Sequence, residues 1–161
     1  MTINEIINTT KHRPWEIPAR NWSFYQEWNQ VIFLHWKVEY QELRKIIPDH
    51  LQIDLFEGSP WVSLVAFSME KIRPGNFPSF NPISNFHEIN IRTYVKLKNK
   101  AGVYFLSIEA ANKISCKISR ILSRLPCRYS KMNRNHQYYS SSNTRFGDSF
   151  EIIRFVIKKF V

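Results

Sequence analysis

The chain has few of the residues that hold small proteins together through covalent bonds or metals. Of its 161 residues only two are cysteines, Cys116 and Cys127, which do not form a CxxC pair, and its five histidines lack ligand spacing. We therefore expect no metal site, no cofactor and a reduced, cytoplasmic protein. Because 43% of the residues are hydrophobic, a core can form without such staples.

Long apolar runs are also missing. The chain starts with MTINEIINTTKHRPW, which has no apolar stretch of the signal-peptide type. Its longest apolar run is VIFLHW, far shorter than the roughly 20 residues that a membrane-spanning helix needs. We therefore expect a soluble protein that does not associate with a membrane. No internal repeat or shift in composition marks a boundary, so residues 1–161 are predicted to form one domain.

Acidic residues are scarce in the last third of the chain. Up to Gly102 there are 12 lysines and arginines against 10 acidic residues, whereas from Val103 onward there are 11 against 3. A predicted helix from Glu109 to Leu125 carries a basic stripe of Lys113, Lys117, Arg120 and Arg124. The positive charges of this stripe repel one another, and the repulsion can be relieved by water, by acidic residues of a further segment or by a nucleic-acid backbone. No nucleic-acid motif accompanies the charge, so we favour a solvated or covered face and keep nucleic acid as the alternative.

A polar row follows one face of a predicted strand. The segment FHEINIRTYVK alternates polar residues with β-branched ones, which is typical of a strand. Its polar face consists of Glu88, Asn90, Arg92, Tyr94 and Lys96. The next residues, KNKAGVYFLSIE, predict a hairpin in which Arg92 lies opposite Glu109, Tyr94 opposite Ser107 and Lys96 opposite Phe105. Arg92 and Glu109 would then form a structural pair, and Glu88 has no basic partner.

Glu88 is therefore the leading site candidate. An unpaired carboxylate inside a fold is desolvated and its pKa rises, which suits general acid–base chemistry; at a strand mouth Glu88 would simply be hydrated. The lower-ranked pocket neighbours are Asn90, Arg92, Tyr94 and His35. A lone histidine in a strand such as VIFLHWKV is more often a hydrogen-bonded core residue than a ligand. The proline-rich loop from Ile72 to Phe86 is a candidate cover for the pocket.

Several stretches resemble a known family. They are HRPW, FLHWKV, LRKIIPDHLQIDLFEGSPWVSLVAFSM, FHEINIRTYV, GVYFLSIEAAN, and LP followed by YSKM, and they extend over about residues 12–150. They are similar to the YqjF-like proteins, the domain of unknown function 2071 family, whose fold resembles that of acetoacetate decarboxylase. The resemblance implies an α+β fold, mainly an antiparallel β-barrel with external helices and a small-molecule pocket. Because family members continue past Val161, we expect a C-terminally truncated chain and an incomplete barrel.

The resemblance also bears on the chemistry. Acetoacetate decarboxylase forms a Schiff base through a lysine of a paired-lysine motif, whereas SIEAANKISCKIS has only the separated Lys113 and Lys117, so this role does not carry over. Glu88 lies at about the place of that enzyme's pocket glutamate. The implied ligand is a small carboxylated or carbonyl compound, and the implied reaction type is lyase-like or hydrolytic. The sequence leaves open whether the chain is an enzyme, a homo-oligomer or an inactive fragment.

Overall fold

The computed structural model describes residues 2–13, 16, 19, 21–135 and 138–143, and the backbone of 148–153. In this part of the chain the elements follow in the order α1 (Ile3–Asn8), β1 (Phe24–Lys37), α2 (Tyr40–Arg44), β2 (Gln52–Ile53), β3 (Leu55–Phe56), β4 (Ser59–Pro74), α3 (Asn81–Ser84), β5 (Phe86–Leu97), β6 (Lys100–Ala110), α4 (Lys113–Ser123), β7 (Cys127–Tyr129), β8 (Lys131–Arg134), β9 (Tyr138–Asn143) and β10 (Asp148–Ile153). None of these helices is long and apolar enough to cross a bilayer.

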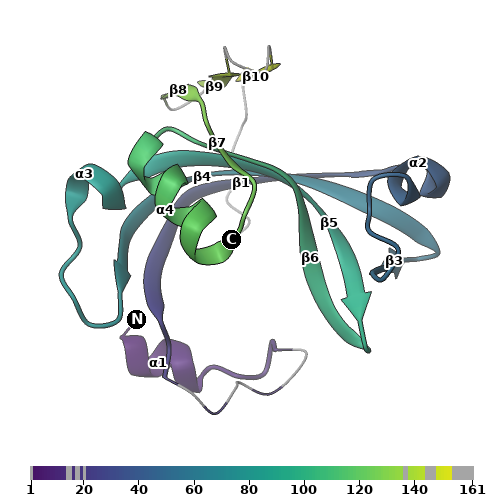
Figure 1. Cartoon of the computed structure of the whole chain (residues 1–161), viewed down its shortest axis with the longest axis horizontal. Coiled ribbons are helices and arrows are strands. Elements are labelled where there is room, and N and C mark those ends of the chain that lie inside the picture. Colours follow the sequence, from purple (N-terminus) through teal and green to yellow (C-terminus); the bar gives the residue numbers. More distant parts are fainter. Residues whose placement is uncertain are drawn as a thin grey trace, which may run out of the picture.

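The main sheet forms an arch (Figure 1). Its strands follow the order β1-β4-β5-β6-β7, antiparallel except for the parallel pair β6–β7, while the short strands β2 and β3 pair with β5 and β4. Strands β8, β9 and β10 form a smaller antiparallel sheet. The prediction of an α+β fold with mainly antiparallel strands is confirmed. Within the described residues the two end strands, β1 and β7, do not pair with each other. The sheet is therefore open, and no closed barrel is found.

Different elements cover the two faces of the arch. On the convex face, the fully buried Tyr139 of β9 packs with Leu64 of β4 and joins the small sheet to the main one. On the concave face, α4 packs through Cys116 against Ile108 of β6. Strand β4 lies between these two layers, and residues 62–69 are buried at every position. The centre of the sheet is thus shielded from water on both sides, which allows a pocket to form beside it.

The β5–β6 hairpin has a different register from the predicted one. Lys98 and Asn99 form a two-residue turn with φ angles of 49° and 62°, so Leu97 pairs with Lys100. Such a turn needs positive φ at both central positions, for which Asn-Gly is the usual sequence. The sequence Lys-Asn therefore does not predict this turn type. An irregularity between Ile91 and Arg92 shifts the pairing once more. The consequence is seen in the pairs of the polar row.

The predicted cross-strand partners of the row are therefore wrong. Arg92 pairs with Phe105, Tyr94 with Val103 and Lys96 with Ala101. Glu109 pairs with Ile89 on the other face, where it accepts hydrogen bonds from Ser141 Oγ (2.6 Å) and Asn143 Nδ2 (3.4 Å). Arg92 and Glu109 thus lie on opposite faces of the sheet and cannot form the predicted pair.

Helix α4 is shorter than predicted because the chain stays in β6 up to Ala110. Asn112 caps its first turn by accepting hydrogen bonds from the backbone N–H groups of Ile114 and Ser115, both at 3.0 Å. Arg124 ends the helix in the left-handed conformation, with φ of 54°. Its large apolar side chains are mostly exposed, and they are Ile114, Ile118, Ile121 and Leu122. The helix is therefore attached to the sheet along only a narrow part of its surface.

Candidate functional site

A cavity of about 520 Å³ lies between α4 and the concave face of the main sheet. Its walls come from β1, β4, β5, β6, α4 and β7, and from the loop that follows β4. Most of the lining is apolar, and the large side chains include Trp28, Phe86 and Phe105. Arg73 and Glu88 are the charged residues among the described lining. Such a hollow, apolar with few polar groups, is the usual form of a small-molecule site.

Glu88 stands in this cavity near the start of β5. It lies between Phe67 of β4 and Ala110 of β6, which are its partners in the sheet. Within the described structure its carboxylate is in no salt bridge and accepts one hydrogen bond, from Asn90 Nδ2 to Oε1 at 3.2 Å. Burial removes water from the carboxylate and raises the pKa of Glu88 from 4.5 to about 7, against the smaller opposing effect of Asn90.

Asn90 extends the polar row inward from Glu88. Its side chain is 1% exposed, and its Oδ1 atom has no hydrogen-bond partner in the described part of the chain. A buried acceptor without a donor is costly, so this oxygen would readily accept a hydrogen bond from a bound hydroxyl or amine. The row thus has an acid and a free acceptor side by side.

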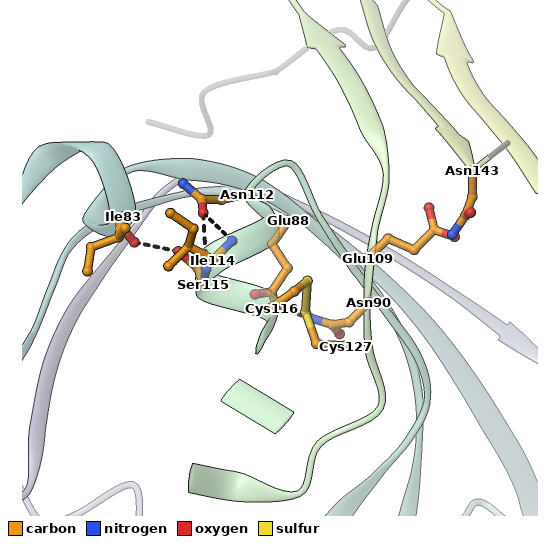
Figure 2. The surroundings of a disulfide bond; sticks show 10 residues. All are labelled: Ile83, Glu88, Asn90, Glu109, Asn112, Ile114, Ser115, Cys116, Cys127 and Asn143. Atoms are coloured by element: carbon orange, nitrogen blue, oxygen red, sulfur yellow. Dashed lines mark hydrogen bonds between the residues drawn. A yellow bond between two sulfur atoms is a disulfide. The ribbon is translucent and has the colours of Figure 1, made fainter. Parts of the chain in front are cut away.

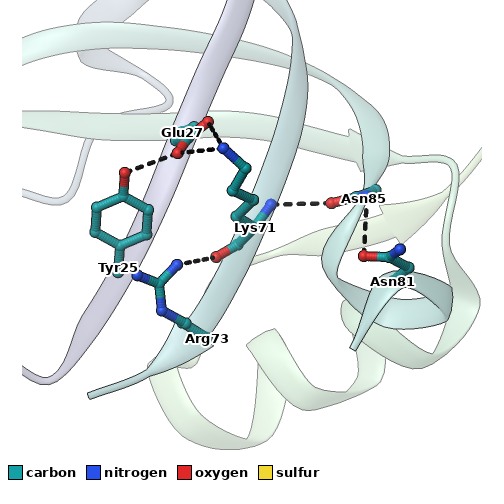
Figure 3. Close-up of polar contacts among 6 residues, drawn as sticks. All are labelled: Tyr25, Glu27, Lys71, Arg73, Asn81 and Asn85. Atoms are coloured by element: carbon teal, nitrogen blue, oxygen red, sulfur yellow. Dashed lines mark hydrogen bonds and ion pairs between the residues drawn. The ribbon is translucent and has the colours of Figure 1, made fainter. Parts of the chain in front are cut away.

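The rim of the cavity carries Arg73, held by an ordered set of side chains (Figure 3). Its guanidinium carbon lies 4.0 Å from the ring centroid of Tyr25. The Tyr25 hydroxyl donates to Glu27 (2.7 Å), and Glu27 forms an ion pair with Lys71 (3.0 Å), which helps to lower the pKa of that carboxyl. Lys71 therefore neutralises Glu27, while Arg73 is in no salt bridge with the described acidic residues and donates from Nη1 to the Lys71 carbonyl oxygen at 3.4 Å.

Helix α4 is fastened over the cavity by a disulfide. Cys116 of α4 is bonded to Cys127, which begins β7 and lines the cavity (Figure 2). The prediction of two reduced cysteines is therefore wrong for this structure. The sequence could not reveal the pair, because the bond depends on a helix folding back onto a neighbouring strand.

The loop after β4 contributes to the same enclosure. Of the predicted cover from Ile72 to Phe86, Ile72 and Pro74 lie in the end of β4, Ile83 lies in α3 and Phe86 starts β5, and all four line the cavity. Nδ2 of Asn112, the N-cap of α4, donates to the carbonyl oxygen of Pro82 (2.6 Å), and Oγ of Ser115 in α4 donates to that of Ile83 (2.7 Å). The loop and the helix are thus joined at one end of the site, and α3 within the loop gives it a fixed shape.

The other predicted site residues lie on the same concave face but outside the described cavity lining. Arg92 and Tyr94 follow Asn90 along β5. His35 is hydrogen-bonded, as expected, through Nδ1 to Ser63 Oγ at 2.6 Å, but it is exposed and therefore not a core residue. Ser63 Oγ also contacts the Tyr94 hydroxyl at 2.7 Å. Sequence reasoning missed Ser63 and Arg73, because nothing in their local patterns distinguishes them from other strand residues.

Neither the Schiff-base lysines nor the basic stripe gains support from this geometry. No lysine is found among the described residues that line the cavity. Lys113 and Lys117 are exposed, and the Lys113 ammonium lies 4.9 Å from the ring centroid of Tyr129. Arg120 and Arg124 are exposed as well, which fits a solvated face. In the part of the chain that is described, no three metal-binding side chains come together.

Comparisons with known proteins agree with the fold and the resemblance. Residues 25–157 match the family model of domain of unknown function 2071, described as an uncharacterized conserved protein. Over 116 residues the chain is 34% identical to the uncharacterized protein YqjF of Bacillus subtilis (strain 168), which covers 72% of this chain and 48% of that protein.

Solved structures with a similar fold include acetoacetate decarboxylase from Legionella pneumophila, with a TM-score of 0.57, 12% identity, and coverage of 79% of this chain and 50% of that one. An acetoacetate decarboxylase-like enzyme from Sphingomonas wittichii RW1 has a TM-score of 0.54 at 13% identity, over 74% of this chain and 51% of that one. The chain thus spans about half the length of these relatives, and identities this low show the fold alone. The chain belongs to the domain of unknown function 2071 family, and its fold is similar to that of acetoacetate decarboxylase.

Proposed function

We propose that the protein binds a small carbonyl-bearing carboxylate in the cavity under α4, with Glu88 as its acid–base group. One observation carries this proposal: Glu88 lies in a mostly apolar cavity, and burial raises its pKa to about 7. Near neutral pH such a carboxyl is partly protonated and can donate a hydrogen bond or a proton to a carbonyl oxygen. A carboxyl with the usual pKa would be ionised at this pH and could only accept.

The two charged residues of the lining support a ligand with two different ends. Glu88 suits the carbonyl oxygen, and Arg73 at the rim suits a carboxylate, which a guanidinium binds through paired N–H groups. The apolar walls between them exclude water and strengthen both interactions. A cavity of about 520 Å³ is in the range of small-molecule sites.

If a reaction follows binding, we propose that it proceeds without a lysine imine. Loss of carbon dioxide from a β-keto acid leaves an enolate, and a protonated Glu88 can transfer its proton to that enolate oxygen. The fold suggests this chemistry, a shared ancestry with the decarboxylases and a barrel of their type. The carboxyl in the cavity is the stronger ground.

Calorimetric titration with acetoacetate tests the proposal, with butyrate as the ligand that lacks the carbonyl. We expect acetoacetate to bind more tightly than butyrate and Glu88→Leu, which removes the hydrogen-bond donor, to weaken acetoacetate at least tenfold. The matched control is Glu109→Leu, which changes a glutamate of the adjacent strand on the opposite face. Equal affinities of the two variants would refute the role of Glu88, and borohydride trapping of a lysine adduct would refute the lysine-free route.

A further inference from the structure

A second group of polar side chains lies on the concave face beyond Asn90, outside the described lining of the cavity. It consists of Phe33 and His35 of β1, Ser63 of β4, and Arg92 and Tyr94 of β5, and we call it the Arg92 cluster. His35 pairs with Ser63, and Ser63 pairs with Arg92, so these three residues form one row across neighbouring strands. The row brings together residues that are far apart in the sequence, and neither the cavity nor Glu88 accounts for it.

Arg92 is the charged centre of this cluster. Its guanidinium carbon lies 5.4 Å from the ring centroid of Phe33, so the side chain extends from β5 across β4 toward β1. In the described structure it forms no salt bridge, and its buried Nε–H has no hydrogen-bond acceptor. A buried donor on a permanent cation is costly to leave unpaired, and an incoming oxyanion would satisfy it.

A chain of hydroxyl groups ends next to Arg92. His35 Nδ1 lies 2.6 Å from Ser63 Oγ, which lies 2.7 Å from the Tyr94 hydroxyl. When His35 carries its proton on Nδ1, it donates to Ser63 and Ser63 donates to Tyr94. The Tyr94 O–H is then free to donate to a ligand. Because Tyr94 and Arg92 are two residues apart on one strand, both point to the same face.

The cluster also has an unsatisfied neighbour on the side of the cavity. Asn90, two residues before Arg92 on the same face, is 1% exposed and has an Oδ1 atom without a partner among the described residues. The face therefore holds a buried donor without an acceptor and a buried acceptor without a donor at adjacent positions. Two such groups point to a ligand or an ordered water at this place, since native proteins satisfy nearly all buried polar atoms.

We propose that the Arg92 cluster is a second binding site, which takes the carboxylate group of a small molecule. The planar carboxylate matches the edge of the guanidinium that carries Nε–H and one terminal N–H, and the Tyr94 hydroxyl is the further donor. The site is separate from that of Glu88, because four residues along a strand correspond to roughly 13 Å. It does not depend on the proposed function, since Arg73 and Glu88 take no part in it.

NMR spectroscopy of the arginine Nε–H groups of the whole chain tests this site directly. Sodium acetate is titrated at constant ionic strength, with sodium chloride as the reference and sodium phosphate in a parallel series. The Arg92 resonance is identified by its absence in Arg92→Lys. We expect acetate to shift it in a saturable manner. In the variants, acetate binding is followed through the backbone amide resonances of the Arg92 cluster. Arg92→Lys should weaken acetate binding at this site at least tenfold, and Tyr94→Phe should weaken it about threefold.

The matched control is Arg73→Lys, which changes the arginine of the cavity rim and should leave the Arg92 shifts unchanged. An Arg92 resonance in the unmodified chain that does not respond to acetate, or responds equally to chloride, would overturn the site. A saturable response to phosphate alone would overturn its assignment to a carboxylate. Because Glu88→Gln should not alter the Arg92 response, loss of the cavity function and loss of this site are distinguishable.

Discussion

Replacing Glu88 with glutamine should make the protein more stable at pH 8 while changing its stability much less at pH 5. In the folded protein the pKa of Glu88 is raised from 4.5 to about 7 because the carboxylate is desolvated. Between these two values the unfolded chain releases the proton and the folded chain keeps it, so stability falls as the pH rises. Glutamine has nearly the same shape but no charge, so it removes this cost.

The size of the effect follows from the two pKa values. Ionisation of Glu88 in the folded state costs about 3 kcal/mol once the pH is above both of them, and about 1 kcal/mol at pH 5. The hydrogen bond from Asn90 is retained in the variant, because the glutamine side-chain oxygen can also accept it. The difference in free energy of unfolding between Glu88→Gln and the parent should therefore be about 2 kcal/mol larger at pH 8 than at pH 5, in favour of the variant.

Urea unfolding of both proteins at the two pH values measures this difference. The control is Glu27→Gln, because hydrogen bonds from Tyr25 and Lys71 lower the pKa of Glu27 and reverse the sign. Glu27 stabilises the fold above its unfolded pKa, and that contribution is lost as the pH falls, so its replacement should destabilise the protein at pH 8. A difference between Glu88→Gln and the parent that does not change with pH would refute desolvation of Glu88.

Two further predictions concern the attachment of α4. Reduction of the Cys116–Cys127 bond, which joins residues 11 apart, should lower the free energy of unfolding by about 3 kcal/mol, because the unfolded chain gains freedom. Urea unfolding with and without dithiothreitol measures this loss. The prediction would be contradicted if the reductant affected the parent as little as it affects the Cys116→Ser/Cys127→Ser variant. Asn112→Ala should cost about 1 kcal/mol by removing the cap of α4, whereas Asn112→Asp keeps the capping oxygen and should lose less; equal losses in thermal unfolding would show that the cap is unimportant.

The strand pattern of Phe86 to Lys96 predicts which residues share a face. Alternation places Glu88 and Asn90 on one face, and in the structure Asn90 Nδ2 donates to Glu88 Oε1. Burial raises the pKa of Glu88 to about 7, which agrees with one of the two environments that the sequence leaves open for it. Its role in binding stays a prediction. Two-residue periodicity indicates individual strands and hairpins. The mainly antiparallel α+β fold is what the family resemblance implies, and the structure confirms it.

The pairing of that strand could not be predicted with the same evidence. The two-residue turn at Lys98 and Asn99 pairs Arg92 with Phe105, four residues from the expected Glu109. Such a turn needs positive φ at both positions, for which Asn-Gly is the usual sequence. The irregularity between Ile91 and Arg92 then shifts the pairing by one residue, and this shift places Glu109 on the face opposite Arg92.

Contacts between elements that are distant in the sequence could also not be predicted. The disulfide depends on how α4 folds back onto β7, and the placement of Arg73 depends on where the end of β4 lies relative to the cavity. Apolar residues recur at helical spacing along α4, yet Ile121 is 69% exposed. Periodicity identifies which residues share a face but does not show what covers that face.

Carbon-13 NMR titration of the Glu88 carboxyl group tests the central claim most directly. The resonance is assigned by its loss in Glu88→Gln and followed between pH 3 and pH 9. We predict a midpoint near pH 7, well above that of Glu27 in the same spectra, whose pKa is lowered by its partners. A midpoint near the ordinary value of 4.5 would show that water reaches the carboxylate, and it would contradict the proposal that Glu88 is the acid–base group of a desolvated cavity.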